Sequence, residues 1–161
     1  MSEITYLKWK NLDGIQLENA WIRVIILPEL GGKIASVCYK KRQFEFAAQY
    51  RGEAYRLPGT DADFIEYDAS GLDDAFPNIV RAEISCGEDE NVLYPDHGEI
   101  WYSSFSHRIC GDEVELYCRS SLFSYSYRKR VALRKNRVEL SYEIANEAAQ
   151  PFPCLWAFHG L

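Results

Sequence analysis

The segments LFSYSYRKRVAL at residues 122–133 and VELSYEI at residues 138–144 alternate between apolar and polar side chains. Their apolar positions are Phe123, Tyr125, Tyr127, Val131, Leu133, Val138, Leu140, Tyr142 and Ile144, and the polar positions between them include Ser124, Ser126, Arg128, Arg130, Glu139, Ser141 and Glu143. A period of two places neighbouring side chains on opposite faces of a strand, so we predict two half-buried antiparallel strands. Arg134-Lys135-Asn136 predicts the turn between them, with Asn136 in the left-handed conformation.

Shorter strands are predicted on the N-terminal side of this pair. Residues 20–27 (AWIRVIIL) are almost continuously apolar, which is typical of a strand covered on both faces. Gly31-Gly32 supplies a tight turn before a strand at 34–39, and Gly111-Asp112 supplies one between strands at 101–109 and 114–119. Because no segment shows a convincing helical period, the predicted fold class is all-β, an antiparallel β-sandwich or barrel.

The chain is predicted to be a single domain, residues 1–161, or the N-terminal part of one. Periodicity is lost from about residue 49 to 78, which indicates a long loop region in which Asp73 and Asp74 could cap a short helical turn. The last predicted strand, 152–158, ends at His159-Gly160-Leu161 and leaves an unpaired sheet edge. The sandwich is therefore expected to be incomplete.

Composition and charge argue against several classes of partner. The net charge of −6 disfavours nucleic acid, whose binding depends on cationic contacts with phosphates. The short basic runs 40–42 and 128–130 are interpreted as solvated strand ends or turns. No apolar run approaches the roughly 20 residues of a membrane-spanning helix, and the N-terminus resembles no targeting signal, so we predict a cytoplasmic protein without a membrane partner.

The five cysteines, Cys38, Cys86, Cys110, Cys118 and Cys154, are widely spaced and odd in number. This pattern disfavours a disulfide framework and a zinc knuckle. We interpret most of them as small buried hydrophobic residues.

The best candidate for chemistry is YPDHGEIW at residues 94–101. Pro95 and Gly98 bracket Asp96 and His97, so a turn should present the imidazole at a loop edge. His97 could be catalytic, could be a turn histidine held by a neighbouring carboxylate, or could share a metal site with Asp73 and Asp74. A metal site needs several convergent ligands, which the sequence does not reveal, and no metal or cofactor is predicted.

Two other histidines and the paired aspartates are further candidate site residues. His107 is interpreted as a strand-surface residue, whereas His159 ends an aromatic strand in phase with Ala157 and opposite Trp156 and Phe158. Asp73 and Asp74 could serve as the paired carboxylates of a glycosidase. Adjacent strand residues face opposite sides, however, so that pairing would need a partner from elsewhere.

Four segments in this order resemble the aldose 1-epimerase, or galactose mutarotase-like, family: LPELGGKI at 27–34, GLDDAFPNI at 71–79, PDHGEIW at 95–101 and LWAFH at 155–159. The resemblance implies a large antiparallel β-sandwich, the galactose mutarotase-like supersandwich, whose concave face binds a free or phosphorylated monosaccharide. It further implies an isomerase that interconverts α and β anomers by acid–base ring opening.

The resemblance also implies roles for particular residues. His97 would contact a sugar oxygen and His159 would be the general acid, with histidine suited to both because its pKa lies near neutrality. Further substrate contacts are expected from Asp73, Asp74, Phe76, Asp96, Glu99 and Trp101, of which Phe76 and Trp101 would offer apolar faces to the sugar ring. The family's glutamate base lies in its C-terminal half, so a second copy of the chain or a C-terminal half would have to supply it. The alternative function is a non-catalytic carbohydrate-binding or sensor domain.

Overall fold

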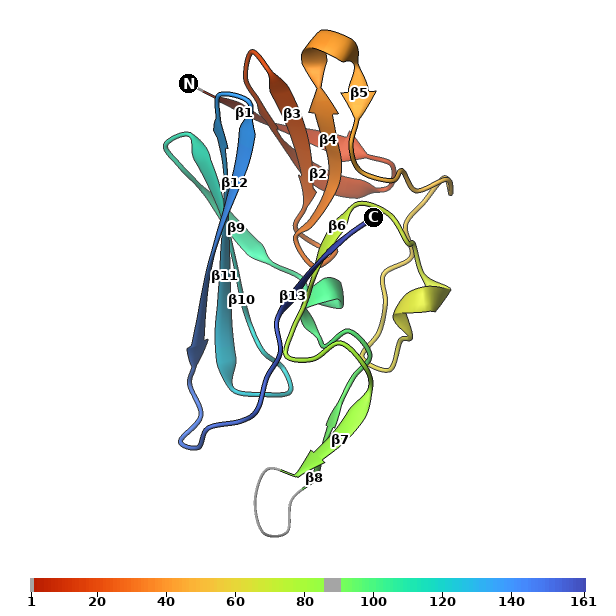
Figure 1. The fold of residues 1–161 in the computed structure, drawn as a ribbon, viewed down its shortest axis with the longest axis vertical. Helices are drawn as coiled ribbons and strands as arrows, with labels where there is room; N and C mark the ends of the chain where they lie inside the picture. Colours follow the sequence, from red (N-terminus) through yellow and green to blue (C-terminus); the bar gives the residue numbers. More distant parts are fainter. Residues whose placement is uncertain (1, 86–90) are drawn as a thin grey trace.

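The computed structural model describes residues 2–85 and 91–161, whose strands form two antiparallel sheets and a small ribbon (Figure 1). Within these ranges the first sheet has the order β1-β2-β3-β4-β6-β13, with β5 beside β4, and the second sheet has the order β12-β11-β10-β9. The first sheet comprises β1 (Glu3–Trp9), β2 (Leu12–Glu18), β3 (Ile22–Leu27), β4 (Lys33–Tyr39), β5 (Phe44–Glu45), β6 (Leu72–Ala75) and β13 (Ala157–Gly160). The second sheet comprises β9 (Ser106–Cys110), β10 (Glu113–Arg119), β11 (Tyr125–Arg134) and β12 (Arg137–Asn146). The predicted all-β antiparallel sandwich is confirmed.

Three short 3₁₀ helices and a two-stranded ribbon complete the described elements. The ribbon pairs β7 (Ala82–Ser85) with β8 (Asn91–Tyr94) and extends away from the two sheets in Figure 1. The 3₁₀ helices are η1 (Lys40–Arg42), η2 (Phe64–Glu66) and η3 (Ile100–Tyr102). Among the described residues, no helix has the length and hydrophobicity that a membrane crossing requires.

The main hydrophobic core lies between the two sheets, and a smaller one covers the other face of the first sheet. Alternate residues of β3 explain why its sequence is apolar throughout. Val24 and Ile26 pack into the main core, whereas Ile25 and Leu27 pack into the second core with Tyr55 of the following loop region. The strand is therefore covered on both faces, as predicted from residues 20–27.

The paired strands β11 and β12 confirm the alternation in residues 122–144. Residues of β11 are buried at alternate positions up to Val131, and Val138, Leu140 and Tyr142 of β12 are half-buried, whereas Ile144 is exposed. The turn differs in detail from the prediction, because Lys135, at φ 57°, takes the left-handed conformation in place of Asn136. Lys129 also departs from the prediction of a solvated basic run, since its side chain is fully buried.

Three other sequence-based predictions need correction. The region 49–78 contains η2 and β6, so Asp73 and Asp74 lie in a strand and cap no helical turn. The strand predicted at 101–109 begins only at Ser106, because η3 precedes it. Among the described cysteines, Cys38 and Cys118 are buried but Cys110 and Cys154 are exposed, and Cys86 lies outside the described residues.

Candidate functional site

Asp73 and Asp74 are consecutive residues of β6 and point to opposite sides of the first sheet. Asp74 accepts hydrogen bonds from Lys129 Nζ at 2.8 Å and from the Tyr142 hydroxyl at 2.9 Å, both in the second sheet. Asp73 instead accepts a hydrogen bond from Lys33 Nζ at 2.5 Å on the other side. We call that side, which faces away from the second sheet, the outer face of the first sheet.

The pairing of β13 with β6 places His159 on this outer face. His159 lies directly opposite Asp73 in the antiparallel register, and directly opposed residues point to the same side of a sheet. Trp156, which directly precedes β13 and is partly exposed, lies on the side of the second sheet and donates its indole N–H to the Tyr127 hydroxyl at 2.8 Å. The predicted phase, with His159 opposite Trp156, is therefore confirmed.

A turn between β8 and η3 presents His97, as predicted from its flanking Pro95 and Gly98. His97 has φ 56° and Gly98 has φ 70°, so two successive residues take the left-handed conformation. A Cβ atom at position 98 would overlap the Phe76 carbonyl, which only glycine avoids. The His97 amide donates to the Ile79 carbonyl at 2.9 Å and anchors the turn.

The tertiary fold gathers His97 and His159 with Phe64 and Trp101 into one group, which we call the aromatic–histidine cluster. The ring centroids of His97 and His159 are 5.6 Å apart. Phe64 stacks on His97 at 4.3 Å, and its ring lies 5.2 Å from that of His159 and 5.1 Å from that of Trp101. Both imidazoles are partly exposed, whereas Phe64 and Trp101 are buried, so the histidines form the solvent side of the cluster.

Asp96 joins the cluster through its backbone and its side chain. Its carbonyl accepts the Trp101 indole N–H at 2.9 Å, and Oδ2 accepts the Phe64 amide at 2.8 Å. Oδ1 lies 3.2 Å from Nδ1 of His97, although the angle is not that of a hydrogen bond. Asp96 is thus the carboxylate nearest to His97 within this group.

A buried charge cluster lies beside His159 on the outer face. Lys33 Nζ contacts Asp73 Oδ2 at 2.5 Å, Asp68 Oδ2 at 3.0 Å and the Ser70 carbonyl at 2.7 Å. Burial raises the pKa of Asp73 to about 6 even though the Lys33 ammonium opposes the shift. Burial would lower the pKa of Lys33, but the two carboxylates outweigh it and raise that pKa.

The surroundings of His159 favour its neutral form. Burial is the largest cause that lowers the pKa of His159, followed by the nearby His97 and Lys33. Its Nδ1 atom and that of His97 are both buried without a hydrogen-bond partner among the described residues. As a result, a smaller fraction of His159 is protonated at neutral pH. The protonated form, however, gives up its proton more readily than the imidazolium of an ordinary histidine.

The structure does not bring every predicted site residue to this surface. Asp74 is buried between the sheets, and Phe76 packs edge-on against Tyr125 in the main core. Glu99 is fully buried and accepts hydrogen bonds from Ser120 and Ser121. Of the predicted residues, His97, His159, Asp96 and Trp101 come together, with Asp73 opposite His159 in the sheet.

Phe64, Lys33 and Asp68 belong to this region but were missed in the sequence. Phe64 and Asp68 lie in the region without periodicity, where no pattern indicates which side chains turn inward. Lys33 directly follows the Gly31-Gly32 turn, within one of the segments that carry the family resemblance. That position was the only available signal for it.

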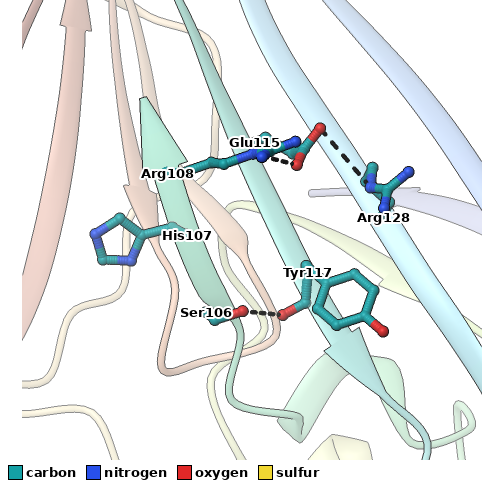
Figure 2. A pocket seen from close by; sticks show the side chains of 6 residues that line it. All are labelled: Ser106, His107, Arg108, Glu115, Tyr117 and Arg128. Atoms are coloured by element: carbon teal, nitrogen blue, oxygen red, sulfur yellow. Dashed lines mark hydrogen bonds and ion pairs between the residues drawn. The ribbon is translucent and has the colours of Figure 1, made fainter. Parts of the chain in front are cut away.

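A separate cavity of about 280 Å³ lies on the exposed face of the second sheet (Figure 2). It is lined by Ser106, His107, Arg108, Glu115, Tyr117 and Arg128. Glu115 accepts from Arg108 Nε at 2.7 Å and from Arg130 Nε at 2.8 Å, so the cavity is bordered by cross-strand ion pairs. His107 is an exposed residue of β9, as predicted, and this cavity contains none of the predicted site residues.

Metal ligation was the remaining alternative for His97. Among residues 2–85 and 91–161, no group of three or more His, Cys, Asp or Glu side chains is arranged to hold a metal ion. In particular, Asp74 lies on the opposite side of β6 from the histidines, so the combination of His97 with both aspartates does not form.

Comparison with known proteins identifies the fold. No protein-family model and no curated protein matches the sequence. A galactose mutarotase-like protein from Lactobacillus casei superimposes with a TM-score of 0.72 at 16% identity, over 91% of this chain and 49% of that protein. A galactose mutarotase-like protein from Clostridium acetobutylicum gives 0.68 at 17% identity, over 99% and 53%. A 4-alpha-glucanotransferase from Thermococcus litoralis gives 0.58 at 16% identity, over 89% and 24%.

These likenesses establish the galactose mutarotase-like fold that the sequence resemblance implied. The chain spans about half the length of the two galactose mutarotase-like proteins. It therefore corresponds to part of that fold.

Proposed function

We propose that this chain contributes the two histidines of an aldose 1-epimerase-like site, in which His97 and His159 contact a monosaccharide and assist the exchange of its anomers. The observation that carries the proposal is the convergence of the two imidazoles, 5.6 Å apart, from a turn and from a strand. Both are partly exposed, and the buried ring of Phe64 contacts both of them. The shared fold supports the choice of reaction.

Anomer exchange needs one proton removed and another delivered. A base takes the proton of the hydroxyl on C1, the bond between C1 and the ring oxygen breaks, and an acid protonates that oxygen. The open-chain aldehyde then rotates about its C1–C2 bond and closes by the reverse steps. His159 is assigned as the acid because its lowered pKa makes its imidazolium a ready proton donor, and His97 is assigned as a contact to a sugar oxygen.

The base is assigned to the part of the fold that this chain does not span. Asp73 is held by Lys33 in a buried ion pair, and Asp96 Oδ2 accepts the Phe64 amide. Each carboxylate is held through its Oδ2 atom, and Asp73 is almost completely buried, so neither side chain can move toward a hydroxyl group of a sugar without changing these contacts. A C-terminal half or a second copy of the chain would supply the base, and the sugar would be free or phosphorylated.

A second candidate is a carbohydrate-binding or sensor domain without turnover. The contacts of Asp73 and Asp96 favour it, because each of these carboxylates near the histidines is already held through one oxygen. Such a domain would keep the aromatic–histidine cluster as a sugar contact surface. It would leave the rate of anomer exchange unchanged.

One pair of measurements separates these functions. Freshly dissolved α-anomers of several aldoses and aldose phosphates are followed by polarimetry and NMR exchange spectroscopy, with the protein extended to the full length of the fold. Faster exchange than in buffer supports the isomerase. Shifts of the His97 and His159 resonances with sugar, without faster exchange, support the binding domain. The absence of both effects for every sugar rejects both functions.

A further inference from the structure

Phe64 is turned inward from a segment that otherwise has little regular structure. It lies in η2, on the long connection from β5 to β6 (Figure 1). Phe64 is 7% exposed, whereas the adjacent Ile65 is 88% exposed. A single side chain of this turn is therefore docked against the rest of the protein, and its position calls for a physical reason.

The ring of Phe64 contacts both histidines of the proposed site. Its plane is inclined by 18° to that of His97 in a stacked arrangement and by 60° to that of His159 in an edge-on arrangement. Trp101 supports the ring from a third direction with an interplanar angle of 74°. Such contacts restrict the rotation of partly exposed imidazoles, which would otherwise sample several rotamers.

The Asp96 carboxylate connects the same turn to His97. Its Oδ2 atom accepts the Phe64 amide at 2.8 Å, and its Oδ1 atom lies 3.2 Å from His97 Nδ1. The two oxygens of one side chain therefore contact two segments that are distant in the sequence. His97 itself has a positive φ of 56°, which is uncommon for a residue with a side chain and requires support from its surroundings.

We propose that Phe64 and Asp96 are positioning residues: Phe64 fixes the planes of both imidazoles, and Asp96 couples the docking of the η2 turn to the orientation of His97. The catalytic consequence rests on the proposed function, whereas the effect on the two imidazoles does not. Neither residue needs to touch the sugar. A loss of positioning changes the orientation of the reacting groups, and a misplacement of about 1 Å can reduce a rate by about 100-fold.

The first test compares Phe64→Leu with the matched control Ile65→Leu in the same turn. Leucine keeps an apolar side chain but removes the aromatic ring. In Phe64→Leu, the upfield ring-current shift of the His97 protons should be lost, and the pKa of His159 should rise toward its ordinary value because part of its burial is removed. Ile65→Leu should leave both unchanged. NMR titration of the imidazole resonances, without sugar, measures these effects.

The second test separates the charge of Asp96 from its hydrogen bond. Asp96→Asn retains an oxygen that can accept the Phe64 amide, whereas Asp96→Ala does not. Amide hydrogen exchange at Phe64 should accelerate in Asp96→Ala and stay close to wild type in Asp96→Asn, and the His97 ring-current shift should be lost only in Asp96→Ala.

The outcomes distinguish the positioning role from the proposed function. If Phe64→Leu and Ile65→Leu give the same imidazole shifts and the same His159 pKa, the positioning role is rejected. It is also rejected if Asp96→Ala and Asp96→Asn give the same Phe64 amide exchange and the same His97 ring-current shift. If the imidazoles respond as expected but the full-length protein does not accelerate anomer exchange, the positioning role stands and the isomerase is rejected. If the positioning role and the isomerase function are both correct, Phe64→Leu should lower kcat by about 100-fold with a smaller change in KM.

Discussion

The imidazole rings of His97 and His159, one in a turn and the other on an edge strand, lie with their centroids 5.6 Å apart. The pairing of β13 with β6 fixes this relationship, because it carries His159 onto the face where the turn after β8 presents His97. Two partly exposed imidazoles at this separation can contact one small ligand together. This arrangement is the basis of the first prediction.

Replacing either histidine by glutamine should reduce anomer exchange by about 100-fold or more in the full-length protein, because His159→Gln removes the proposed general acid and His97→Gln removes the proposed contact to a sugar oxygen. His107→Gln is the matched control, since His107 is exposed on β9 in the second sheet. NMR exchange spectroscopy at a fixed sugar concentration gives the rates. Equal rates for all three variants would contradict the assignment of His97 and His159.

Asp73→Asn should alter how stability depends on pH. Burial raises the pKa of Asp73 from 3.8 to about 6 in the folded protein, so between these values the native state keeps a proton that the unfolded chain has lost. The contribution of this carboxyl to stability is present below its unfolded pKa and is lost as the pH rises through about 6. The free energy of unfolding of wild type, relative to Asp73→Asn, should therefore fall between about pH 4 and pH 7. Urea unfolding at both pH values measures this difference, and a constant difference would refute the prediction.

Lys129→Met should destabilise the protein by about 3–5 kcal/mol, because it leaves the Asp74 carboxylate buried without its cation. Both side chains of this ion pair are 0% exposed, and the pair joins the two sheets. The double variant Lys129→Met/Asp74→Leu should recover a large part of that loss, since it removes both charges. Lys8→Met, which breaks the exposed pair with Asp13, should cost about 1 kcal/mol or less. Denaturant unfolding of the four proteins tests the pattern, which fails if the single buried change costs no more than the exposed one.

Glu99→Gln should lower stability without changing sugar affinity. The Glu99 side chain is fully buried and accepts hydrogen bonds from the hydroxyl groups of Ser120 and Ser121 and from the Ser121 amide. Replacing one oxygen by an amide group leaves at least one of these donors poorly paired, at a cost of about 1–3 kcal/mol. Glu143→Gln, at an exposed position of β12, is the control. Weaker sugar binding by Glu99→Gln at unchanged stability would instead restore Glu99 as a substrate contact.

The longer central strands could be predicted from the sequence, because the pattern that specifies a half-buried strand is local, whereas β1, β2, β7 and β8 were not predicted. The alternation over residues 122–144 predicts β11 and β12, and the continuous apolar run at 20–27 predicts a strand covered on both faces. The turn around His97 could also be predicted, since Pro95 and Gly98 restrict the backbone within a few residues. The less regular segments were predicted poorly. Strand β6 is short, and its two aspartates hide it because they break the apolar pattern of a buried strand. They can be buried there only because each pairs with a lysine from another strand, which the local sequence does not show.

The sequence by itself determined the all-β class, the placement of adjacent strand side chains on opposite faces of a sheet, and the turn that presents His97. Only the tertiary structure decided which of these residues meet. The pairing of β13 with β6 brings His159 to His97, and the docking of η2 adds Phe64. Lys33 and Lys129 come from other strands to pair with Asp73 and Asp74 on opposite faces of β6. The physical reason is that backbone periodicity acts over a few residues, whereas strand pairing and the burial of charge depend on contacts between segments far apart in the chain.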